Sequence, residues 1–195
     1  VASSKYYPYA ADEPFNGIYP HRLYGERLQE YKQTMQEMGA DEIYWQDYTA
    51  FPTWREMTME GSPSEYDLYL VSYHKVEFKQ SRTPIPLVVE MAAKQYLELN
   101  PATARAKGIA DGDEVVVESQ NAVTGETRQV KVPVSYRESI RPDTVAMPHH
   151  YGEYNNHPWL KGQGASPNSL FFTGEGYVAQ TADQTYCVKV KVTKA

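Results

Sequence analysis

The stretch that decides the fold is Asn100-Pro-Ala-Thr-Ala-Arg-Ala-Lys-Gly-Ile-Ala-Asp-Gly-Asp-Glu-Val-Val-Val-Glu-Ser119. Asn100 suits a helix N-cap because its side-chain oxygen can accept a free backbone N–H, and Pro101 suits the first helical position. Gly108 can adopt the left-handed conformation that ends a helix. Residues 111–113 favour a tight turn before a strand that begins at Val115. The stretch therefore predicts a short helix that leads straight into a buried strand.

The sequence around this stretch predicts more short strands. They cover residues 68–73, 96–99, 127–136, 143–147 and 186–192, with a short helix at 85–93 and a hairpin turn at 121–126. Alternating Val130, Val132 and Val134 are typical of a strand with one buried face. Six or so short strands with two small helices favour a mainly β fold, a closed β-barrel, over a parallel sheet.

The first third of the chain has a different character. Leu23–Met38 predicts an amphipathic helix, and Gly39 is placed to end it. A single amphipathic helix needs another surface to cover. We therefore expect residues 1–62 to be a connecting segment that packs on domains outside this chain, and residues 63–195 to form the barrel.

Composition excludes several classes of protein. The 195 residues carry a net charge of −6, which argues against a nucleic-acid backbone as the partner. No apolar run approaches the 18 residues that a membrane-spanning helix needs. The single cysteine, Cys187, excludes an internal disulfide, and also a multi-cysteine zinc site or cysteine-ligated iron–sulfur cluster within this chain. The chain begins at Val1, so we expect a piece of a longer protein or a separate subunit.

The deciding stretch, LNPATARAKGIADGDEVVVES, resembles the signature of the C-terminal molybdopterin-dinucleotide-binding domain of the dimethyl sulfoxide reductase family of molybdenum and tungsten enzymes. The resemblance runs from about Asp67 to the C-terminus. RLYGERLQEY, at Arg22–Tyr31, is similar to the helix that closes the catalytic domains in that family. The resemblance implies a six-stranded double-psi β-barrel that binds molybdopterin guanine dinucleotide and forms part of an oxidoreductase.

The loop Ser72–Thr83 is the first candidate binding element, because it leaves a strand and carries many hydrogen-bond donors. Lys, Ser and backbone N–H groups suit a pyrophosphate, although the composition alone fits an ordinary solvated loop better. The resembled family uses this loop for the dinucleotide. The resemblance therefore assigns a cofactor role to Ser72, His74, Lys75, Val76, Gln80 and Ser81.

Two further segments are candidates through the same resemblance. Gly162-Gln-Gly-Ala-Ser-Pro-Asn168-Ser-Leu170 is similar to the family's small-residue run, in which the Asn contacts the pterin and glycines allow a close backbone approach. A flexible turn would use the same residue types. The residues before the final CVKVKV strand contact the cofactor in that family, which nominates Gln184 and Thr185, although a lysine is frequent there.

No residue pattern predicts catalysis or metal binding by this chain. His149, His150, His157 and Glu153 lie in a loop rich in Gly, Asn and Pro, without the spacing of a metal site, so we expect them to form a polar lining near the cofactor or a substrate channel. The family resemblance places the ligand of molybdenum or tungsten, and any iron–sulfur cluster, in other domains or subunits.

The expected partners are the remaining catalytic domains and an electron-transfer iron–sulfur subunit, without nucleic acid and without direct membrane insertion. QSRT and CVKVKV look most like the arsenate, polysulfide and thiosulfate reductase branch, which suggests the periplasmic or exported side of a prokaryotic membrane. The alternative is a non-enzymatic barrel of the same topology, an adaptor that binds protein or peptide.

Overall fold

A computed structural model describes residues 20–46, 48–49, 54, 56–77, 86–91, 94–152, 164–174 and 188–195. The chain divides into two compact units, residues 1–55 and residues 56–195. No helix in the described part of the chain is long and apolar enough to cross a membrane.

The first unit contains the predicted amphipathic helix, α2 (Pro20–Glu37), followed by the 3-10 helix η1 (Glu42–Tyr44). Gly39, with a φ of 72°, follows the last helical turn. On the apolar face, Tyr31 is 55% exposed and Met38 is 75% exposed. The helix is confirmed, and its packing on domains outside this chain stays a prediction.

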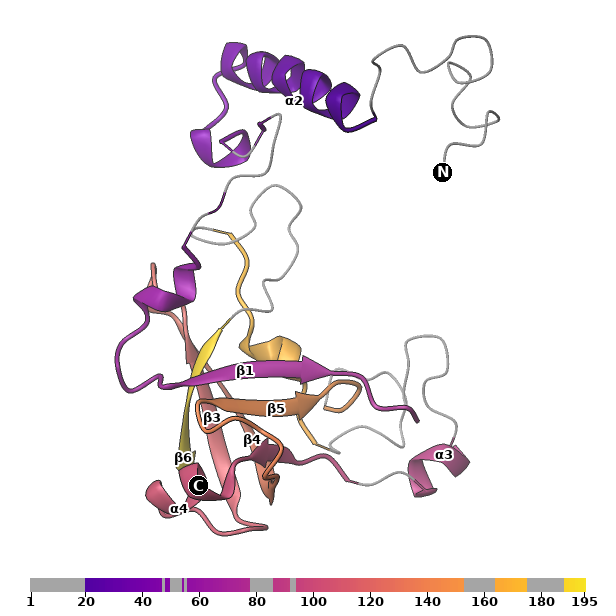
Figure 1. The fold of residues 1–195 in the computed structure, drawn as a ribbon, viewed down its shortest axis with the longest axis vertical. Helices are drawn as coiled ribbons and strands as arrows, with labels where there is room; N and C mark the ends of the chain where they lie inside the picture. Colours follow the sequence, from indigo (N-terminus) through magenta and orange to yellow (C-terminus); the bar gives the residue numbers. More distant parts are fainter. Residues whose placement is uncertain are drawn as a thin grey trace. The chain divides into compact units, whose positions relative to one another are not determined.

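The second unit is a closed barrel in which the strands follow the order β1-β5-β2-β4-β3-β6 (Figure 1). This confirms the predicted mainly β, six-stranded double-psi barrel. The strands are β1 (Leu68–Tyr73), β2 (Leu97–Leu99), β3 (Glu114–Gln120), β4 (Thr127–Tyr136), β5 (Thr144–Pro148) and β6 (Lys189–Lys194). The helices of this unit are α3 (Pro86–Met91), α4 (Pro101–Ala106) and the 3-10 helices η2 (Thr58–Gly61) and η3 (Pro167–Leu170).

The deciding stretch folds as its sequence predicts. Asn100 caps α4, because its side-chain oxygen accepts a hydrogen bond from Ala102 N at 2.9 Å. The same side chain donates to Ile140 O at 2.7 Å, which ties the helix start to the loop before β5. Gly108 ends the helix with a φ of 68°. The stretch therefore connects β2 to β3 with a capped helix, and its role is to support the fold.

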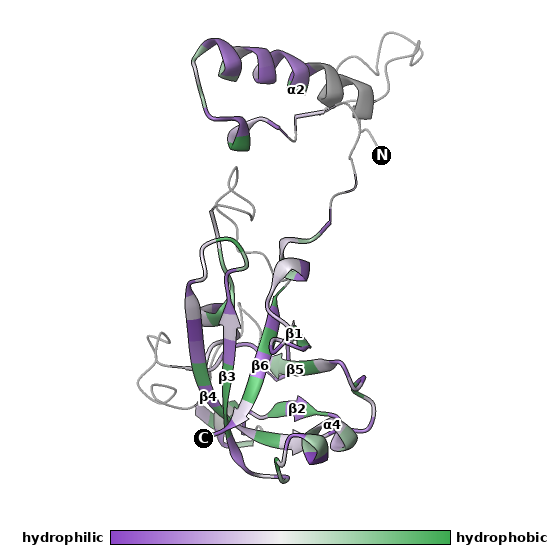
Figure 2. Ribbon diagram, turned by 90° about the vertical axis from the view of Figure 1, so that its left-hand side faces the viewer, coloured by the Kyte–Doolittle hydropathy of each residue, from purple (hydrophilic) through white to green (hydrophobic). Residues whose placement is uncertain are grey.

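Strand alternation builds the core. In β3 the buried positions alternate with half-buried ones, and the neighbouring strands alternate likewise at Val132 and Val134 of β4 and at Val190 and Val192 of β6. Figure 2 colours these strands by hydropathy. The fully buried side chains include Val115, Val117, Leu97, Leu99, Leu68, Met147, Ile109, Leu170, Phe171 and Phe172. The apolar side chains inside exclude water from the barrel, so the ligand-binding groups must lie at its ends or on its outer surface.

Polar side chains on the outer surface link neighbouring strands. Glu118 on β3 pairs with Lys191 of β6 at 2.6 Å and accepts hydrogen bonds from Tyr66, at 2.6 Å, and from Gln129 of β4. The hydrogen bond from Lys191, followed by that from Tyr66, lowers the pKa of Glu118 to about 2. One carboxylate therefore connects three strands and the segment before β1.

The start of the second unit includes residues that the sequence assigned to the connecting segment. Met59 in η2 is buried, and Glu60 pairs with Lys189 of β6 at 2.6 Å. The structure thus places residues 56–62 with the barrel.

Replacing Asn100 with Ala tests the cap of the deciding stretch. We expect Asn100→Ala to lower the free energy of unfolding by about 1–2 kcal/mol, because the cap and the bond to Ile140 are both lost. Chemical denaturation of Asn100→Ala and of the exposed control Glu138→Ala measures this. Equal stability of the two variants would contradict the assignment.

The pH dependence of stability tests the Glu118 network. A carboxyl whose folded pKa lies below its unfolded value of 4.5 contributes stability above that value, and this contribution disappears as pH falls towards about 2. We expect Glu118→Gln to lose less stability than the wild type between about pH 5 and about pH 2. Thermal unfolding across this range, with Glu138→Gln as the control, measures the difference, and parallel curves would refute the network's role.

Candidate functional site

Parallel pairing of β1 with β5 creates the site. Tyr73 lies opposite Pro148 at the ends of the two strands. Because parallel strands end at the same edge of a sheet, the segments that follow them, residues 74–77 and 149–152, leave the barrel side by side. Two loops that are far apart in the sequence therefore meet at this edge.

Three histidines gather where these loops meet. The ring of His74 lies 5.2 Å from that of His149 and 5.1 Å from that of His150, between ring centroids. Burial, followed by the nearby histidines, holds the pKa of His149 below its usual value, and burial and His74 do the same for His150. Neutral imidazoles are therefore favoured at these two positions, and each can donate one hydrogen bond and accept another.

His150 also has a backbone conformation that is uncommon for a residue with a side chain. Its φ is 77°, and its buried Nε2 has no hydrogen-bond partner in the described structure. Strained backbone and unsatisfied polar atoms concentrate at functional sites. Both observations mark the end of β5 as a place where a ligand group can bind.

Lys75 reaches from the end of β1 across to two other segments. Its Nζ donates to Lys94 O and to the hydroxyl of Tyr151, both at 3.2 Å. The same ammonium lies 5.4 Å from the centre of the Tyr151 ring. Burial lowers the pKa of Lys75 and raises that of Tyr151 to about 12. Two hydrogen bonds to the protein therefore orient the Lys75 side chain beside Tyr151.

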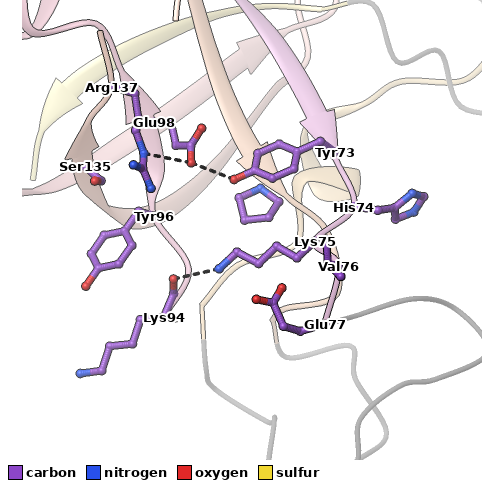
Figure 3. Close-up of a pocket in the computed structure, with 11 residues that line it drawn as sticks. Tyr73, His74, Lys75, Val76, Glu77, Lys94, Tyr96, Glu98, Ser135 and Arg137 are labelled. Carbon is purple, nitrogen blue, oxygen red and sulfur yellow. Dashed lines mark hydrogen bonds and ion pairs between the residues drawn. The ribbon is translucent and has the colours of Figure 1, made fainter. Parts of the chain in front are cut away.

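A cavity of about 420 Å³ opens beside Lys75, and Figure 3 shows the side chains that surround it. Glu98 of β2 accepts a hydrogen bond from the Tyr73 hydroxyl at 3.0 Å and pairs with Arg137 at 3.4 Å. Burial, with Glu98 next, raises the pKa of Tyr73. The wall therefore combines aromatic faces with charges of both signs, which suits a ligand with a ring and an anionic group.

Two glycines allow the segment before η3 to approach this edge closely. A Cβ on Gly152, whose φ is 105°, would lie 2.8 Å from Ser166 N. A Cβ on Gly164, whose φ is 71°, would lie 2.3 Å from Oε1 of Gln95. Any other residue at these two positions would displace the backbone at Ser166 or the side chain of Gln95.

The structure brings together some of the predicted site residues. His74 and Lys75 lie at the common edge, and Ser72 is half-buried in β1 opposite Met147. Asn168 lies in η3, in the segment that contacts this edge through Gly164. Val76 lines the cavity although it is 83% exposed. The remaining candidates lie outside the described residues: Gln80, Ser81, Glu153, His157, Gln184, Thr185 and Cys187.

Sequence reasoning did not single out several residues of this edge. Tyr73, Glu98, Arg137, Tyr151 and Gln95 come from separate places in the chain and meet only through the barrel pairing. Nothing in the sequence around Glu98 or Arg137 indicates a partner for either. Among the described residues, no group of three or more His, Cys, Asp or Glu side chains is placed to hold a metal ion.

Replacing Gly152 with Ala tests the close approach, and Gly174 supplies a matched control. Gly174 has a φ of 91° but nothing within 4 Å of an added Cβ, so its replacement adds backbone strain alone, about 1–3 kcal/mol. We expect Gly152→Ala to cost more than Gly174→Ala, because Ser166 must also move. Denaturant unfolding of both variants measures the difference, and an equal cost would show that the segment does not pack closely.

Comparisons with known proteins agree with this architecture. The chain is 26% identical over 122 residues to dimethyl sulfoxide/trimethylamine N-oxide reductase of Cereibacter sphaeroides, which is 60% of this chain and 14% of that protein. Its fold is similar to that of acetylene hydratase from Pelobacter acetylenicus, with a TM-score of 0.55 and 16% identity over 83% of this chain and 22% of that one.

The chain thus spans less than a quarter of the length of each of these proteins. The family model described as "Molydopterin dinucleotide binding domain" matches residues 68–187, which include the barrel up to the start of its last strand. On the strength of that match and of the barrel, the chain belongs to the molybdopterin-dinucleotide-binding domain family.

Proposed function

We propose that this chain holds the dinucleotide end of molybdopterin guanine dinucleotide in a molybdenum or tungsten oxidoreductase. The observation that carries the proposal is the fixed ammonium of Lys75, which lies at a cavity where two loops meet. A positioned cation of this kind can form charge-assisted hydrogen bonds with a diphosphate, together with donors from neighbouring segments.

The charges around the cavity support an anionic ligand. Lys75, Lys94 and Arg137 contribute three positive charges, against two negative charges from Glu77 and Glu98. This local excess of one positive charge occurs in a chain whose net charge is −6. An anion is therefore attracted to this place and repelled by much of the remaining surface.

The residues present also fit the polar rings of such a cofactor. The buried Nε2 of His150 has no hydrogen-bond partner in the described structure, and a pterin or guanine edge offers both donors and acceptors. Gly152 and Gly164 keep the backbone of the Asn168 segment close to the same edge. Within this arrangement, Lys75 binds the diphosphate, while Asn168 and His150 orient the ring system.

When bound, the cofactor supplies the metal centre for a two-electron redox reaction or an oxygen-atom transfer. This chain contributes binding and orientation. It excludes water from the ligand on the barrel side, where the apolar core begins directly below the strand ends. Ser72, Gln80, Ser81, Gln184 and Thr185 belong to the proposed cofactor contacts through the family resemblance.

The proposal extends to the whole enzyme. Because the relatives are much longer than this chain, we propose that further catalytic domains complete the active site and that the exposed face of α2 packs on them. An iron–sulfur subunit for electron transfer, a role in anaerobic respiration and a location on the exported side of a prokaryotic membrane form part of the same proposal.

Nucleotide binding by this chain tests the proposal. We expect guanosine diphosphate to bind in calorimetric titrations and Lys75→Met to weaken binding about tenfold, since a charge-assisted hydrogen bond contributes about 1.5–3 kcal/mol. Lys131→Met, which removes an exposed lysine from β4, is the matched control and should bind as the wild type does.

A second experiment tests the role of Asn168. After reconstitution with the remaining domains, we expect Asn168→Ala to retain less pterin than the wild type. If neither Lys75→Met nor Asn168→Ala changes nucleotide affinity or pterin content, the residue assignments are wrong. Absence of both nucleotide binding and pterin from the wild-type protein would instead favour the adaptor alternative, which predicts binding of protein or peptide.

A further inference from the structure

Gln95 is a buried polar side chain whose role the cofactor contacts do not explain. It is 3% exposed and precedes β2. Its Nε2 donates to Pro148 O at 2.9 Å and to Ala165 O at 2.7 Å. Its Oε1 accepts a hydrogen bond from Ala165 N at 2.6 Å. The carboxamide therefore satisfies both its donor hydrogens and an acceptor site within the protein.

These bonds join three separate parts of the chain. Pro148 is the last residue of β5, and Ala165 lies in the segment that leads to η3. The paired bonds between Gln95 and both backbone groups of Ala165 resemble the pairing of two strands. The side chain thus takes the place of a neighbouring strand at Ala165.

Gly164 makes this arrangement possible. A Cβ at that position would lie 2.3 Å from Gln95 Oε1 and 3.0 Å from the Cβ of Tyr151. Any other residue would push the carboxamide away from Ala165. The absence of a side chain at Gly164 therefore leaves room for the hydrogen bonds between Gln95 and Ala165.

The C-terminal end of the same segment is also hydrogen-bonded to the barrel. Ser119 Oγ donates to Leu170 O at 2.7 Å, and Arg128 donates to Phe171 O. Leu170 and Phe171 are fully buried in the barrel. Asn168 therefore lies on a short span between two fixed points, of which Gln95 forms the one nearer to the β1–β5 edge.

We infer that Gln95 is a positioning residue, which fixes the Asn168 segment against the end of β5 so that a bound pterin dinucleotide meets a preformed surface. The inference rests on the proposed function. It adds that the affinity of the site depends on a side chain that need not touch the ligand. A preformed surface binds more tightly because less ordering is required on binding.

The test uses the enzyme that contains this chain, with Gln95→Met and Gln95→Glu. Gln95→Met keeps the length of the side chain and removes all three hydrogen bonds. Two readouts are needed: hydrogen–deuterium exchange of the peptide that contains Ala165, and the pterin content of the purified protein. Asn100→Ala is the matched control, because it removes two hydrogen bonds at the opposite end of β2.

We expect Gln95→Met to exchange at least about tenfold faster at Ala165, which corresponds to about 1.4 kcal/mol, and to retain less than about half of the wild-type pterin. Asn100→Ala should keep both properties. If Gln95→Met exchanges and retains pterin as the wild type does, or if Asn100→Ala loses as much pterin, the inference is overturned.

Gln95→Glu adds a pH-dependent readout, and it serves if Gln95→Met fails to fold. Thermal unfolding of the same variant at each pH separates a local effect from a general loss of stability. The protonated carboxyl can donate one hydrogen bond, whereas the ionised form faces two carbonyl oxygens. We expect pterin retention to rise as pH falls from about 9 to about 5, while the wild type changes little. Retention that follows the wild type at every pH would contradict the inference. A wild type without pterin would overturn the proposed function, and exchange at Ala165 would still decide whether Gln95 fixes the segment.

Discussion

Parallel pairing of β1 with β5 is the constraint on which the site depends. The register from Tyr69 opposite Thr144 to Tyr73 opposite Pro148 brings the two strand ends to one edge of the barrel. From that edge, one loop supplies Lys75 and the other supplies His150. A shift of this register would separate these side chains. The same pairing of β1 with β5 therefore closes part of the barrel and positions the side chains of the site.

The barrel gives this edge its rigidity through two different interactions. Inside, closely packed aliphatic and aromatic side chains fill the space between the strands. Outside, Glu118 links β3 to β6 and to Tyr66. A fixed scaffold lets loops carry polar groups in defined positions, because the ordering of those loops is completed before a ligand arrives. Gln95 extends the same principle to the segment that contains Ala165.

Local physical chemistry explains which features could be predicted from the sequence. Capping by Asn100, the positive φ of Gly108, and the alternation of Val132 and Val134 all depend on neighbouring residues, and all were predicted. The partner of each strand depends on residues far away in the sequence, so the cavity beside Glu98 could not be predicted.

The family resemblance supplied the loop of His74 and Lys75 and the segment of Asn168, of which the structure describes residues 72–77 and 164–170. Gln95 was missed because a single glutamine before a strand has no distinguishing local pattern. Its role becomes visible only when Pro148 and Ala165 are placed on either side of it. A crystal structure with guanosine diphosphate bound would test the role of Lys75 most directly. We expect a diphosphate oxygen within hydrogen-bond distance of Lys75 Nζ, at the ends of β1 and β5, and a diphosphate bound anywhere else on the barrel would contradict that role.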